Sequence, residues 1–147
     1  MPSYRTSTVI SRPLGEVFAY LTNISAWSDW MSVEGVHPLD DEPPRIGQRA
    51  EGQMREGKRT DTFGIEITQL EPGRRIGFKT VSGPIDWSGS WVVRAVDVGH
   101  TEVTAEGEMR LKGLRRLLEP LMAGEIRKGE AAELTKLRAK LEKETGN

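Results

Sequence analysis

The sequence predicts an α+β fold in which one antiparallel β-sheet faces a long C-terminal helix. Between residues 61 and 111, four segments alternate apolar and polar side chains, as strands do when only one face is buried. Short turns containing Gly or Pro separate the first three of these segments, and a third turn at Asp97 to His100 precedes the last, as expected for antiparallel neighbours. After Gly113 the alternation stops, and leucines recur at helical spacing as far as about Lys143.

In the first half, Tyr4 to Ile10 is rich in Thr, Val and Ile and is predicted to be a strand. Proline at position 13 suits the first turn of a helix, which the apolar stripe extends to Leu21. A second short helix is expected to carry Ala26, Trp27 and Trp30. Two further strands are then predicted on either side of a proline-bearing loop, Leu39 to Gly47: Ser32 to Pro38 and Arg49 to Met54.

In the second half, four strands complete a seven-stranded sheet: 61–69, 76–81, 86–96 and 101–111. Their alternation places one set of residues on the inner face, namely Phe63, Ile65, Ile67, Ile76, Phe78, Thr80, Trp87, Gly89, Trp91, Val93, Ala95, Val103, Ala105, Gly107, Met109 and Leu111. The C-terminal helix is expected to have a kink or a short separate first part near Leu118, because Pro120 cannot donate a backbone hydrogen bond.

Composition limits the classes of function. A chain of 147 residues fits a single domain spanning residues 1–147, with enough length for its own core. The 21 basic and 22 acidic residues leave no positive excess, so no nucleic-acid partner is expected. There is no cysteine for a disulfide or a thiolate. The chain has no apolar run long enough to span a bilayer and no apolar signal segment, so we expect a cytoplasmic protein without an integral membrane segment.

Several fragments, in this order, carry a family resemblance: the opening strand and helix of residues 10–24, Trp27 and Trp30, residues 70–75, Gly89-Ser-Trp91, residues 99–103 and the helical ending 134–142. Together they resemble the START, birch-pollen-allergen and polyketide cyclase/dehydrase superfamily (SRPBCC). The resemblance implies a helix-grip fold: a seven-stranded antiparallel sheet wrapped around the C-terminal helix, with two short helices after the first strand and an apolar cavity inside. Members bind lipids, sterols or polyketides, catalyse cyclisation or dehydration, or act on partner proteins.

The aromatic residues on the inner face are candidates for binding a hydrophobic ligand, since small-molecule sites are mostly apolar with a few polar groups. The alternative is a packed core, and the inward Gly89, Ala105 and Gly107 fit either strand curvature or an open space. The candidate ligand-binding residues, drawn from the sheet and from both the first and the last helix, are Phe18, Phe63, Phe78, Trp87, Trp91, Met109, Leu118, Met122 and Ile126.

No catalytic motif stands out. Asp61 shares the face of Phe63 at a strand end and is a weak candidate acid or base, with an ion pair to Arg59 or Lys58 as the alternative role. His37 and His100 lie in or next to turns and match neither a hydrolase triad nor a metal-ligand spacing, so no metal is predicted. No phosphate-binding loop or other cofactor motif is present either, and no cofactor is predicted.

Three hypotheses follow. The first is a protein that binds a small hydrophobic or amphipathic ligand, lipid or polyketide-like, between the sheet and the C-terminal helix. The second is an enzyme of the polyketide cyclase or dehydratase type, with Asp61 assisting proton transfer. The third is a protein-interaction module that uses the loop Leu39 to Gly47 and the helix surface.

Overall fold

The computed structural model describes residues 3–112 and 119–144, apart from the side chains of residues 56, 111, 119–123 and 144. The elements follow in the order β1 (Ser3–Ile10), α1 (Leu14–Thr22), the 3₁₀-helix η1 (Ile24–Asp29), β2 (Glu34–Pro38), β3 (Arg49–Glu56), β4 (Arg59–Glu71), β5 (Arg75–Ser82), β6 (Ile85–Asp97), β7 (His100–Leu111) and α2 (Glu119–Glu144). Expected and observed elements agree in number and order. The predicted kink near Leu118 lies outside the described residues.

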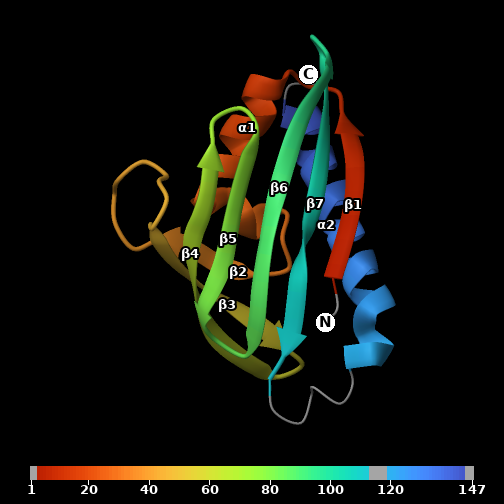
Figure 1. Ribbon diagram of the computed structural model, residues 1–147. Coiled ribbons are helices and arrows are strands. Elements are labelled where there is room, and N and C mark those ends of the chain that lie inside the picture. Colours follow the sequence, from red (N-terminus) through yellow and green to blue (C-terminus); the bar gives the residue numbers. More distant parts are fainter. Residues whose placement is uncertain (1–2, 113–118, 145–147) are drawn as a thin grey trace.

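The seven strands form one sheet in the order β1-β7-β6-β5-β4-β3-β2, and every neighbouring pair is antiparallel. Figure 1 shows this sheet curving around α2, which runs along β1 and β7, while α1 and η1 lie on the same side of the sheet as α2. This arrangement is the helix-grip fold that the sequence predicted.

The predicted alternation holds for most of each strand, because one face packs against the helices. Its clearest failure is Ala95, which was expected to face inward and is exposed. The β6–β7 hairpin extends past the helical layer at this end, and its register shifts between Ala95 and Asp97 (Figure 1). Beyond that point the alternation no longer separates a core face from a solvent face.

The boundaries of β2, β3 and β4 also differ from expectation. Strand β2 begins at Glu34 instead of Ser32, because Ser32 lies in the turn after η1. Strand β3 continues to Glu56, and β4 already begins at Arg59. A tight turn joins the two strands, and in it Gly57 has a φ of 61°. Only glycine adopts such a positive φ without a steric penalty.

The C-terminal end of α2 is fixed to the start of α1. Arg12 donates hydrogen bonds from Nε to the carbonyl of Leu141 at 3.1 Å and from Nη2 to that of Glu142 at 2.9 Å. The backbone N–H of Ser11 donates to the Glu142 carboxylate at 2.8 Å. The last carbonyls of a helix have no partner within the helix, so Arg12 supplies donors that this end requires.

The loop between β2 and β3 is closed by its own polar contacts. Arg45 and Asp40 form an ion pair at 2.8 Å, and the buried Gln48 donates from Nε2 to Asp40 and to the carbonyl of Glu42. The hydrogen bonds from Arg45 and Gln48 hold the pKa of the Asp40 carboxyl well below its usual range. Within the described residues, no helix combines the length and hydropathy needed to cross a membrane.

Candidate functional site

The interior between the sheet and α2 is lined at one end by a continuous aromatic cluster. The ring of Trp91 lies 5.1 Å from Trp27, 5.3 Å from Trp30 and 5.3 Å from Phe78, measured between centroids. Phe78 in turn meets Trp87 edge to face at 4.8 Å. All five rings are buried, which confirms that the predicted strand aromatics face inward and not toward solvent.

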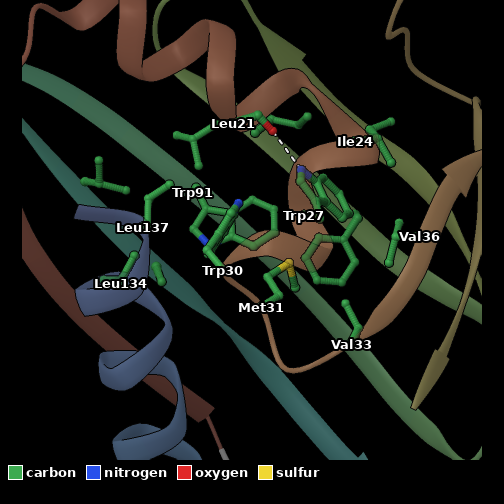
Figure 2. Close-up of a cluster of buried hydrophobic side chains, with 14 of the residues drawn as sticks. Leu21, Ile24, Trp27, Trp30, Met31, Val33, Val36, Trp91, Leu134 and Leu137 are labelled. Carbon is green, nitrogen blue, oxygen red and sulfur yellow. Dashed lines mark hydrogen bonds between the residues drawn. The ribbon is translucent and has the colours of Figure 1, made fainter. Parts of the chain in front are cut away.

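Trp27 and Trp30 bring η1 into this cluster. The indole N–H of Trp27 donates to the backbone carbonyl of Leu21 at 2.8 Å, which ties η1 to the end of α1. Figure 2 shows Trp30 and Trp91 beside Leu134 and Leu137 of α2, so the aromatic rings join both short helices to the sheet and to the long helix.

The remaining candidate residues fall at other places around the interior. Phe63 is buried: an added Cβ would lie 3.0 Å from its ring at Gly52 and 2.7 Å from its Cβ at Gly83. Phe18 and Met109 are partly buried against the core, and Ile126 of α2 is buried. Leu118 lies outside the described residues, as does the side chain of Met122.

Asp61 is half-buried at the start of β4, where its carboxylate meets Arg59 Nε at 3.1 Å. This is the ion pair that the sequence offered as the alternative to a catalytic role. The described contacts of Asp61 place no other titratable partner beside it. Within the described residues, no group of three or more His, Asp or Glu side chains is arranged to hold a metal ion.

A hydrogen bond joins Tyr4 of β1 to Trp87 of β6 inside the sheet. The indole N–H of Trp87 donates to the Tyr4 hydroxyl at 2.8 Å. Both side chains reach across the paired Gly89 and Gly107, where an added Cβ would lie 2.6 and 2.7 Å from the Tyr4 hydroxyl oxygen. These glycines therefore make room for the Tyr4–Trp87 pair, which is more specific than the curvature or open space that the sequence suggested.

Two glutamates of α2 enter the same interior. Glu130 is 5% exposed and Glu133 is 7% exposed, although carboxylates are rarely buried without a charged partner. A carboxylate oxygen of Glu133 accepts the backbone N–H of Ser32 at 2.8 Å. The acid pair, Glu130 and Glu133, thus lies between α2, the turn after η1 and the Tyr4 end of β1.

The acid pair is coupled to Tyr4. Burial raises the pKa of Glu130 to about 9, and the charge of Glu133 and a hydrogen bond to it act in the same direction, while a hydrogen bond with Tyr4 lowers the pKa. Burial and the neighbouring Glu130 also raise the pKa of the Tyr4 phenol. At neutral pH Glu130 is therefore protonated, and a chain of polar groups runs from Trp87 through Tyr4 and Glu130 to Glu133.

Sequence reasoning missed the acid pair, although a signal was present. Ile126, Glu130, Leu134, Leu137 and Leu141 are spaced by four, four, three and four residues, which is one continuous helix face. Glu130 therefore occupies a core position of that stripe, and Glu133 lies one turn before Leu137. A charged residue at a position that the helical period assigns to the core is the pattern that would have identified both.

One buried donor in this interior has no hydrogen-bond partner among the described protein atoms: the indole N–H of Trp30. The Glu133 carboxylate, in contrast, accepts from the Ser32 N–H and from the protonated Glu130. Buried polar groups in folded proteins almost always have a partner, so the unpaired Trp30 N–H indicates a place for a polar group from outside the chain.

The opposite face of the sheet has a different character. A shallow hollow of about 570 Å³ lies there, and its outward-facing lining includes Ser88, Ser90, Glu106 and Glu108. Tyr4, Phe78 and the paired Gly89 and Gly107 also line it, so the hollow reaches the residues of the Tyr4–Trp87 region where the glycines leave the sheet thin.

The fold and this inner face define the class: a single sheet gripping a C-terminal helix, with aromatic rings and a few buried polar groups between them. The chain belongs to the family described as polyketide cyclase / dehydrase and lipid transport, whose model matches residues 1–142. No curated protein matches the chain by sequence.

Solved structures show the same fold at low identity. A protein from Thermus thermophilus superposes with a TM-score of 0.81 at 16% identity, covering 98% of this chain and 99% of that one. The ZhuI aromatase/cyclase from Streptomyces sp. R1128 gives 0.76 at 18% identity, with 95% and 93% covered. A START superfamily protein from Mycobacterium smegmatis gives 0.77 at 11% identity, with 97% and 99% covered.

Proposed function

We propose that this protein binds a small amphipathic molecule between its sheet and α2. The observation that carries the proposal is the indole N–H of Trp30, which is buried among aromatic and apolar side chains and has no partner among the described atoms. A ligand with one polar end would give this N–H an acceptor. Membership of a family described by cyclase, dehydrase and lipid-transport activity supports the same class of ligand.

The apolar part of the ligand would lie against the inner-face side chains. We assign this role to Phe18, Phe63, Phe78, Trp87, Trp91, Met109 and Ile126. Removing the apolar surface of the ligand from water would supply most of the binding free energy, at about 25 cal/mol per Å². The polar groups would orient the ligand.

Binding can be tested with N-phenyl-1-naphthylamine, an uncharged probe whose fluorescence rises in apolar sites. Met109 lies on the inner face of β7 and is partly buried, while Glu108 beside it is exposed on the outer face. Met109→Trp should fill part of the interior and weaken probe binding by about tenfold or more, whereas Glu108→Trp adds the same indole to the other face and should leave binding unchanged. No saturable binding to the wild-type protein would reject the proposal.

A second candidate function is dehydration of the bound molecule. Glu130 is a protonated carboxylic acid held beside a second carboxyl group in a site with little water, which suits general acid–base catalysis. In such a step Glu130 would donate its proton to a departing hydroxyl group, which leaves as water, while Glu133 takes the proton from the adjacent carbon and a carbon–carbon double bond forms. Glu130→Gln should then bind the molecule but fail to dehydrate it.

A further inference from the structure

We infer that the outer face of the sheet carries a second binding site, in the hollow above Ser90, for the hydroxyl groups of a neutral sugar. This site is separate from the interior and does not depend on the proposed function. It follows from the side chains that meet across five neighbouring strands, and from one buried hydroxyl group among them that has no partner in the described part of the chain.

The hollow lies where a row of side chains changes from long to short and back to long. Strand pairing sets five residues beside one another across β1, β7, β6, β5 and β4, namely Arg5, Glu106, Ser90, Gly77 and Gln69. The two residues nearest the middle are small, whereas both ends of the row have long polar side chains. This difference in length produces the hollow, which Arg5, Glu106, Ser90 and Gln69 line.

Ser90 lies at the bottom of the hollow with its hydroxyl group unpaired. The residue is only 9% exposed, although it faces away from the helical layer, and it has no hydrogen bond to another described side chain or backbone group. Thr104 on the same face is equally buried, but its hydroxyl pairs with that of Ser7 at 2.8 Å. Buried hydroxyl groups almost always have a partner, so Ser90 indicates a place for a polar group from outside the chain.

Three further polar groups surround Ser90. On one side Gln69 leans over Gly77, since a Cβ added to that glycine would lie 2.5 Å from Gln69 Oε1. On the other side the Glu106 carboxylate and Arg5 Nε are 3.7 Å apart, which is too long for a hydrogen bond. Both of these charged groups therefore keep their capacity to bond to a ligand.

This mixture of donors and acceptors suits a ligand with several hydroxyl groups. A hydroxyl both donates and accepts, so neighbouring hydroxyls of a sugar can donate to Glu106 and to the Gln69 oxygen and accept from Arg5. The Ser90 hydroxyl can take either role. An ammonium group only donates and a carboxylate only accepts, so each would match only part of the set.

The charge and the shape of the hollow limit the ligand further. Its lining contains one basic residue, Arg5, and two acidic residues, Glu106 and Glu108, so a ligand carboxylate would meet a net negative charge. The aromatic residues of the lining, Tyr4 and Phe78, are buried, and the described lining offers no exposed ring on which a sugar could stack. A few hydrogen bonds without stacking give weak binding, and we expect a Kd on the order of 1 mM.

The test is a titration of isotope-labelled protein with D-glucose, D-glucuronate and D-glucosamine, followed by amide NMR. At slightly acidic pH the second sugar is an anion and the third a cation. Glucose should shift the amide signals of the row around Ser90 saturably, and glucuronate should bind at least about threefold more weakly. Absence of saturable shifts would mean that water alone fills the hollow and would overturn the inference. Tighter binding of either charged sugar than of glucose would overturn the assignment of a neutral ligand.

Ser90→Ala removes only the hydroxyl group and should weaken glucose binding by about threefold or more. Ser82→Ala is the matched control, because Ser82 is exposed on β5 and lies outside the lining of the hollow. This control should bind glucose as the wild type does. Unchanged affinity in Ser90→Ala would contradict the role given to its hydroxyl.

Glu106→Gln tests the charge of the hollow. The amide oxygen still accepts a hydrogen bond, but the negative charge is lost, so the preference for glucose over glucuronate should shrink. Glu102→Gln removes a carboxylate from the same strand, where Glu102 pairs with Arg94, and should keep the wild-type preference. An identical preference in Glu106→Gln and wild type would contradict the argument from charge.

The reporter for the interior shows on which face the sugar binds. Glucose should leave the affinity for N-phenyl-1-naphthylamine unchanged, because the hollow is on the other face of the sheet. Displacement of this probe by glucose would place the sugar in the interior and overturn the assignment to the outer face. Failure of the probe itself to bind would count against the proposed function alone, so the two failures are distinguishable.

Discussion

The indole N–H of Trp87 donates to the hydroxyl of Tyr4 at 2.8 Å, although the two residues are 83 positions apart in the chain. This hydrogen bond crosses β7, which lies between β1 and β6 in the sheet. It passes over the paired Gly89 and Gly107, and it begins the series of polar groups that leads through Glu130 to Glu133. The polar end of the proposed site is thus built around one long-range contact.

Tyr4→Phe should destabilise the protein by about 1–3 kcal/mol, because the buried Trp87 N–H loses its acceptor. Urea unfolding of the single variants and of the double variant with Trp87→Phe measures the coupling. The loss in the double variant should be smaller than the sum of the two single losses, since the double variant has no unpaired Trp87 N–H, and loss of the Tyr4–Glu130 hydrogen bond is common to it and to Tyr4→Phe. Strictly additive losses would mean that the bond contributes nothing.

Gly107→Ala should lower the free energy of unfolding, because its Cβ would overlap the Ser88 carbonyl oxygen and lie 2.7 Å from the Tyr4 hydroxyl oxygen. Gly124→Ala is the control. That glycine is exposed in α2 with nothing within 4 Å of an added Cβ, so alanine should stabilise the helix by about 0.5–1 kcal/mol. Thermal unfolding should show shifts of opposite sign, and a neutral Gly107→Ala would contradict the close packing described here.

Glu130→Gln should change how stability depends on pH. The pKa of the carboxyl rises from an ordinary value of 4.5 to about 9 on folding, so between these values the folded protein holds a proton that the unfolded chain has released. The free energy of unfolding of the wild type therefore falls as pH rises across this window, with a limiting slope of about 1.4 kcal/mol per pH unit. Glutamine does not titrate, so the variant should lack this decline.

Urea unfolding of wild type and Glu130→Gln at several values between about pH 5 and pH 8 measures the difference. The variant should gain stability relative to the wild type as the pH increases. Glu125→Gln, which removes an exposed carboxylate from the same helix, should follow the wild type. Parallel curves for wild type and Glu130→Gln would show that Glu130 ionises normally in the folded protein.

Arg12→Lys should loosen the C-terminal end of α2. Lysine retains the charge but cannot match the fork of the guanidinium, which donates to the carbonyls of Leu141 and Glu142 together. We expect a loss of about 1–2 kcal/mol and faster amide hydrogen exchange confined to the last turns of α2. Arg127→Lys, on the exposed side of the same helix, should leave both measurements unchanged.

The fold was largely predictable from the sequence because its signals are local. Alternation in 61–69 and 101–111 reports which side chains share a face, and the leucine spacing of the last segment reports a helix. The same rule failed at Ala95, where the hairpin passes beyond the helical layer and neither face is covered. Periodicity indicates faces, but only the extent of the neighbouring layer determines how far a face stays buried.

The sequence by itself determined the seven strands, the gripping helix and the inward direction of Phe63, Phe78, Trp87 and Trp91, since each depends on spacing along one segment. The tertiary structure alone decided that Tyr4, Trp87, Glu130 and Glu133 meet. These residues come from three elements, and their proximity depends on strand order and on the rotation of α2 about its axis. The pKa and the hydrogen bonds of a buried polar residue depend on the neighbouring groups that exclude water from it. Those neighbours are brought together only when the sheet and the helices pack against each other.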